Sequence, residues 1–342
     1  MRPLCLLTVT LLTLLPCERL AAADAKWLHL GSAHFDLYTS ESESDAKAAL
    51  VHLETTRAYF LATTRFHDPA GKTVRIVAFR ADADYSKYKP DEIRTSRAYG
   101  LAGVGQPTIV VAGLKPEVWE QIFREYAQLV LDDSAPTLPY WFRSGLAAVY
   151  STVKPSDAGM ILGSAPRSNF RAGQVGDVDL QLLFSVNREA LLASREKGAN
   201  DFYAATTDTG ANNGQQALSG SRDPNGAAAT ALNGVQSSLS QSQDFARSAR
   251  VLVHMLMFQQ DYRSKFGLFM RTLAAGGETG SAFSAAYGAP ISKIAADLNI
   301  YAKQTGVIVV TMPFKAEKPA SPDVKPVAKE ELDRILGDLG KR

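Results

Sequence analysis

The sequence predicts an α+β protein in which a small mixed β-sheet with helices precedes a mostly helical half. Two observations carry this prediction. Short alternating or β-branched runs, such as WLHLGSAHFDLYTS over residues 27–40, are typical of strands joined by a tight turn. Longer segments with apolar residues three and four positions apart, such as FREYAQLVL over residues 123–131, are typical of amphipathic helices.

The first residues resemble a secretory signal peptide over residues 1–23. Arg2 supplies a positive charge, Leu4 to Leu15 form an apolar stretch, and Ala21 to Ala23 form a small-residue cleavage site. We therefore expect an exported protein, periplasmic or secreted, that is cleaved near Ala23. Lipid attachment at Cys17 is the alternative, although the proline before it fits such a signal poorly.

Composition excludes several classes of function. Both cysteines, Cys5 and Cys17, lie within the expected signal, so cleavage at Ala23 leaves no disulfide and no thiol chemistry. The formal net charge of +2 favours neither nucleic acid nor a charged membrane surface as a partner. No later apolar run approaches the roughly 20 residues that span a bilayer, so we expect no transmembrane segment.

Residues 24–203 are expected to form the α+β part. Pro116 stands where a helix tolerates proline, at its first turn, and Ser42 or Ser44 is a suitable cap for an earlier helix. The expected elements in this part are a hairpin over 27–40, a helix over 45–63, strands over 73–79 and 107–113, helices from 116 and over 140–150, a hairpin over 160–170 and a helix over 179–195.

Residues 204–243 differ in composition from the rest. Small and polar residues dominate there, so the segment cannot bury enough apolar surface to offset its ordering entropy, and we expect a disordered insert. Residues 244–314 are expected to complete the same domain, mainly as helices over 245–258, 262–273 and 291–301 with a last strand over 306–312. Residues 315–342 are expected to be a Pro/Lys-rich linker followed by a short helix over 330–339.

Four stretches carry a resemblance to a known family. They are KWLHLGSAHFDLYTS, VRIVAFRADADYSKYKP, LPYWFRSGLAAVYSTVKP and LVHMLMFQQDYRSKFGLFM, and their order and spacing cover most of the chain outside the insert and the tail. The chain resembles the peptidase-MA-like family, which are gluzincin-type metallopeptidase domains of exported bacterial proteins often linked to tetratricopeptide repeats. The resemblance implies a zincin-like fold.

In active members of that family, an HExxH helix is followed by a helix with the pattern WLNEGLAE. Two histidines one helical turn apart and a glutamate from the second helix hold zinc, and the glutamate of HExxH serves as general base. The histidine positions fall on Arg124 and Gln128, the base on Glu125 and the third ligand on Ser144, with Arg143 in the place of the preceding asparagine. Arginine has no lone pair to donate, so we expect no zinc and treat Glu125 as a remnant base.

Two interpretations of these residues stay open at the level of sequence. Arg124 and Gln128 lie opposite the apolar face of their helix, so they are either ordinary exposed polar residues or part of a remodelled cleft. In the second case, the Arg124 guanidinium stands in the place of the metal charge and pairs with a carboxylate. The residues expected in such a cleft are Arg124, Arg143, Tyr126 and Trp141.

Other kinds of site find little support. The five histidines form no HxH or HxxxH pair; His254 lies in a strongly apolar helix and is expected to be a satisfied core residue. His29 and His34 flank one turn, face each other across it if the hairpin allows, and are expected to be structural. Asp132 and Asp133 are expected to face solvent at a helix end. Neither GxSxG nor a phosphate-binding GK[ST] loop is present.

These observations lead to three hypotheses of function. The first is a non-catalytic binding or scaffold module, without cofactor, that has lost its zinc ligands and binds an unknown protein or peptide. The second is an active hydrolase with an unusual site around Glu125. The third is an interaction protein whose tail, residues 315–342, docks a partner.

Overall fold

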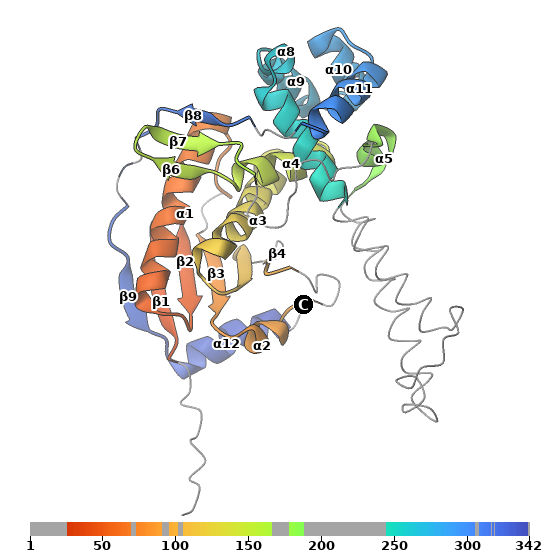
Figure 1. Ribbon diagram of the computed structural model, residues 1–342. Helices are drawn as coiled ribbons and strands as arrows, with labels where there is room; N and C mark the ends of the chain where they lie inside the picture. The colour runs from red at the N-terminus through yellow and green to blue at the C-terminus, as the bar shows by residue number, and fades with distance from the viewer. Residues whose placement is uncertain are drawn as a thin grey trace, which may run out of the picture.

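The structure is a computed structural model that describes residues 26–69, 73–90, 96–101, 105–165, 178–187, 244–304, 308–315, 317 and 319–340. It confirms the α+β class, with a mixed six-stranded sheet, a three-stranded sheet and a helical region (Figure 1). The expected signal, residues 1–23, and the expected insert, residues 204–243, lie outside the described residues. No helix in the described ranges is long and apolar enough to cross a membrane.

The six-stranded sheet has the order β4-β5-β3-β2-β1-β9. The hairpin prediction is confirmed, because β1 pairs antiparallel with β2 and places Leu30 opposite Leu37. Strands β2, β3 and β5 are parallel neighbours, whereas β4 pairs antiparallel with β5 and leaves its other edge without a strand among the described residues. The strand bounds are β1 Leu28–Gly31, β2 Phe35–Thr39, β3 Val74–Phe79, β4 Ala98–Leu101, β5 Thr108–Ala112 and β9 Asp323–Pro326.

Two long helices, α1 (Glu43–Thr64) and α3 (Pro116–Ser134), pack on one face of this sheet. Their apolar residues share one core with alternate sheet residues such as Leu37 and Ile76, as the period of two along a strand requires. The expected cap is confirmed at Ser42, whose side chain accepts from the Asp45 amide, and Pro116 occupies the first turn of α3. This packing fixes α3 beside the edge strand β4.

The C-terminal residues correct one expectation. Part of the expected linker is strand β9, which pairs with β1, and α12 (Lys329–Gly340) follows it. Ile335 and Leu339 of α12 are buried in a second core on the other face of the sheet, together with α2 (Asp82–Ser86). Only Val324 is apolar in the strand DVKP, so composition suggested a linker; the open edge of β1 supplies the pairing that the local sequence does not show.

The three-stranded sheet corrects a second expectation. Its strands are β6 (Lys154–Ser156), β7 (Gly159–Leu162) and β8 (Val310–Met312), in the order β6-β7-β8. The hairpin expected over 160–170 instead begins with β6, before residue 160. Its turn ends at Gly159, whose φ of 130° favours glycine. Residues 166–170 lie outside the described part. The strand expected over 306–312 is confirmed for its second half.

The helical region contains residues 244–258 and five short helices: α5 (Leu180–Ser185), α8 (Gln260–Arg263), α9 (Phe266–Ala274), α10 (Thr279–Tyr287) and α11 (Ile291–Ala302). The single helix expected over 262–273 is divided between α8 and α9, and α10 was not predicted because small residues hide its period. Helix α4 (Tyr140–Tyr150), predicted with these bounds, joins this region to the sheet. A Cβ at Gly145 would lie 2.4 Å from the Ala249 carbonyl oxygen, so glycine permits this close approach.

Candidate functional site

The residues in the expected active-site positions lie on α3 and α4, beside strand β4. Helix α3 contacts both β4 and β5, and the short turn after Ser134 returns the chain to pack α4 against α3. The start of α3 is fixed by Trp119, whose indole Nε1 donates to the Leu114 carbonyl oxygen over 2.7 Å. Helices α3 and α4 therefore lie side by side, as a site built from two helices requires.

Glu125 points from α3 to the edge strand. Its Oε2 accepts a hydrogen bond from the Gly100 amide over 3.1 Å, and its Oε1 lies 3.2 Å from Arg124 Nη2. The Ala112 amide donates to the Arg97 carbonyl oxygen, so the Arg97 carbonyl points toward β5. Because hydrogen-bonded and non-bonded pairs alternate along an antiparallel pair, the backbone amide of Gly100 points away from β5. The Glu125 carboxylate thus accepts a hydrogen bond from a backbone amide of β4 that points away from the sheet.

Arg124 and Glu125 form a pair of very different exposure. The Arg124 side chain is 42% exposed, whereas that of Glu125 is 19% exposed. Arg124 therefore lies at the protein surface, as one interpretation expected, and also pairs with a carboxylate, as the other expected. The carboxylate belongs to the neighbouring residue, so the pair spans no new cleft.

Gln128 and Arg143 meet at a third residue, Asp132. Gln128 Nε2 donates to Asp132 Oδ1 over 2.7 Å, and Arg143 Nη1 lies 2.8 Å from the same oxygen. Arg143 and Asp132 are 16% and 18% exposed, so the ion pair is largely shielded from solvent. The expectation that Asp132 faces solvent is wrong, because this carboxylate joins α3 to α4; Asp133 is exposed as expected.

Tyr126 and Trp141 do not belong to this site. Tyr126 is fully buried, and its hydroxyl donates to Asp68 on another side of α3. Trp141 is 1% exposed and packs against Phe184, with ring centroids 5.0 Å apart. The expected cleft is wrong for both residues, since each faces the core. Ser144 is half-buried on α4, next to Arg143.

The side chains in the expected ligand positions do not fit a zinc ion. Arg124 holds a proton on every nitrogen, and Gln128 already donates to Asp132, so neither offers the lone pair of a histidine. In the described part of the chain, no three His, Cys, Asp or Glu side chains are grouped so that they could hold a metal ion. These side chains therefore support no metal-dependent step at this place.

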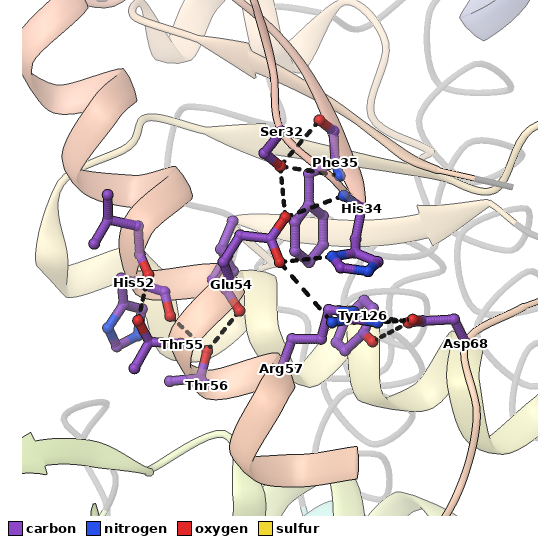
Figure 2. Close-up of polar contacts among 12 residues, drawn as sticks. Ser32, His34, Phe35, His52, Glu54, Thr55, Thr56, Arg57, Asp68 and Tyr126 are labelled. Atoms are coloured by element: carbon purple, nitrogen blue, oxygen red, sulfur yellow. Dashed lines mark hydrogen bonds and ion pairs between the residues drawn. The ribbon is translucent and has the colours of Figure 1, made fainter. Parts of the chain in front are cut away.

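A second polar cluster, not predicted from the sequence, joins the β1–β2 turn to α1 and α3 (Figure 2). Glu54 of α1 is 8% exposed and accepts from the Ser32 hydroxyl, the His34 amide and His34 Nδ1, over 2.7, 3.0 and 2.8 Å. Arg57 binds Asp68, and Tyr126 donates to the same carboxylate. The spacing of Glu54 and Arg57 on one helix face was the only available signal.

Hydrogen bonds and a neighbouring charge favour the charged form of Asp68 in this cluster. Burial alone would raise the pKa of Asp68, but hydrogen bonds from Arg57 and Tyr126 and the Arg57 charge outweigh burial, so the pKa is lowered. Burial and the Asp68 charge raise the pKa of Tyr126, which keeps its hydroxyl protonated as a donor. Through these contacts the cluster connects the β1–β2 turn, α1 and α3.

His254, His29 and His34 each have a structural environment. His254 is 3% exposed, with Nδ1 2.6 Å from the Tyr301 hydroxyl and Nε2 2.8 Å from the Gly163 carbonyl, which confirms a satisfied core histidine. Burial lowers its pKa to about 4. His29 stacks on Tyr38 at 4.5 Å, whereas His34 bonds Glu54, so the two do not face each other across the hairpin.

No family model matches this chain, and no curated protein matches it.

Proposed function

We propose that this chain is a non-catalytic binding or scaffold module, exported from the cell and built on a metallopeptidase-like framework whose zinc ligands are lost. The observation that carries the proposal is the environment of Glu125. The carboxylate in the position of the general base is engaged by the Gly100 amide on one oxygen and by Arg124 on the other.

A general base in such a site needs a metal-bound water and a free oxygen that reaches the water proton. Neither Arg124 nor Gln128 can bind a metal ion as a histidine does. Both oxygens of Glu125 are already engaged by protein groups. The Arg143–Asp132 ion pair supports the same proposal, because it ties α3 to α4 without any metal.

A protein or peptide is the proposed partner. The formal net charge of +2 gives no electrostatic basis for binding nucleic acid, and export is supported by the signal-like residues 1–23. The tail is not the proposed docking element, because α12 buries Ile335 and Leu339 against the chain's own sheet.

The test measures zinc content and hydrolysis of unfolded protein by the purified chain, in parallel with Glu125→Gln. The expected result is no bound zinc, and no hydrolysis that differs between the two proteins. Stoichiometric zinc, or hydrolysis that Glu125→Gln abolishes, would overturn the proposal in favour of an active hydrolase.

A further inference from the structure

Sheet edges are templates for pairing with another chain unless a protein protects them. The outward side of β4 is capped: the Gly100 amide bonds Glu125, and the Ala98 amide bonds the Ser96 hydroxyl. Strand β9 carries Lys325, paired with Asp323 over 2.6 Å, and ends in Pro326. Strand β6 contains Lys154 and Pro155. Side-chain caps, lysine and proline therefore protect three of the four edges in the described sheets.

The fourth edge, strand β8, has none of these protections within the strand, although Pro313 follows it directly. The segment Ile308–Met312 contains neither a charged residue nor a proline, and three of its four residue types are β-branched. Ile308, Val309 and Met312 are 36%, 51% and 40% exposed. Strand β8 pairs with β7 on one side, and Figure 1 shows it at the outer limit of the small sheet.

This edge is also held in place. The Tyr59 hydroxyl of α1 donates to Met312 Sδ over 3.1 Å, and Phe314 packs edge-on against the Tyr59 ring at 5.2 Å. Because the strand is anchored at one end and paired with β7, it is ordered before any partner arrives. Less conformational entropy is then lost on pairing than with a mobile segment.

We infer that β8 is a self-association site, at which two copies of this chain pair β8 to β8 antiparallel about a two-fold axis. The register centred on Val310 places Val309 opposite Thr311 of the second copy, and Ile308 opposite its Met312. Every opposed pair is uncharged, so no like charges meet, and apolar or β-branched pairs favour a sheet. The same surface serves both copies, as a two-fold interface requires.

The product is one continuous sheet, in the order β6-β7-β8 followed by β8-β7-β6 of the second copy. Strand β8 is short, so the buried area lies at the low end for specific interfaces and the dimer is weak. Self-association is therefore expected to depend strongly on protein concentration. It is independent of the function proposed for α3 and α4.

Sedimentation velocity over a wide range of concentration tests this inference with paired charge variants. Val309→Lys with Thr311→Lys places lysine opposite lysine and is expected to abolish the dimer. Val309→Lys with Thr311→Glu places lysine opposite glutamate at the same two exposed positions and is expected to restore it. Ile300→Lys, at a 65% exposed apolar residue of α11, is the control and is expected to dimerise like the wild type.

A wild-type chain that stays monomeric at every concentration would overturn the inference. So would a dimer that survives the double-lysine change, or one that Ile300→Lys removes equally. Failure of the lysine–glutamate variant to recover would reject the register. Circular dichroism of each variant separates loss of pairing from loss of fold.

Discussion

The backbone amide of Gly100 donates a hydrogen bond over 3.1 Å to the carboxylate of Glu125. This contact joins the edge strand β4 to helix α3, and it uses a donor that faces away from the rest of the sheet. A side chain that the resemblance assigned to a catalytic base thereby acts as a cap on a strand edge, which is a structural role with measurable consequences.

The first prediction concerns this cap. Glu125→Ala leaves the Gly100 amide without its acceptor, so its hydrogen exchange should accelerate, and unfolding free energy should fall by about 1 kcal/mol. Glu125→Gln keeps an acceptor at the same place and should retain most of the protection. Exchange at Gly100 that is equal in all three proteins would show that the contact does not form in solution.

The second prediction concerns the bridge between α3 and α4. Asp132→Ala leaves Arg143 and Gln128 without their shared acceptor in a largely shielded place, so it should cost about 1–3 kcal/mol of unfolding free energy. Asp133→Ala removes the same charge from the next, exposed residue and should change stability by less than about 0.5 kcal/mol. Denaturant unfolding of both variants checks the bridge; equal losses would mean that only helix-end charge matters.

The third prediction concerns pH. The pKa of Asp68 is lower in the folded chain than its ordinary value of 3.8, so its stabilising contribution is complete above that value and is lost as pH falls through the folded pKa. Asp68→Asn should therefore be less stable than the wild type at neutral pH, and this difference should shrink as pH falls below 3.8. Urea titrations at several pH values measure it; a difference that stays constant into strong acid contradicts the role assigned to Asp68.

The fourth prediction concerns α12. Ile335→Ala removes a side chain that is 1% exposed in the second core, so it should lower unfolding free energy by about 2–5 kcal/mol. Arg334→Ala, at an exposed position of the same helix, should have little effect. Thermal unfolding of the two variants distinguishes a structural helix from a free tail, for which both changes would be neutral.

The sequence predicted most elements of the sheet half because helices such as α3 and α4 have a clear apolar period, and because β3 is a short β-branched run. It did not predict β9 or the packing of α12, because pairing with β1 is a tertiary effect that the Pro/Lys composition conceals. The short strand β4, which positions Glu125, was missed because AYGL carries almost no pattern.

The site was predicted in part. The framework pattern located Arg124, Glu125, Gln128 and Arg143 on adjoining helices, but it could not show that Asp132 joins two of them. Tyr126 and Trp141 were assigned to a cleft from their chain positions alone, although both belong to apolar helix faces. The cluster around Glu54 and Asp68 unites residues from distant segments, so no local pattern announces it (Figure 2).

The most direct test of the proposed framework is the zinc stoichiometry of two proteins. One is the wild-type chain, and the other carries Arg124→His, Gln128→His and Ser144→Glu, which restores the ligand types of a gluzincin site. If the framework is metallopeptidase-like and only its ligands are lost, the wild type should hold no zinc and the folded triple variant should hold one ion per chain. Zinc in the wild type, or none in a triple variant with wild-type thermal stability, would contradict the account.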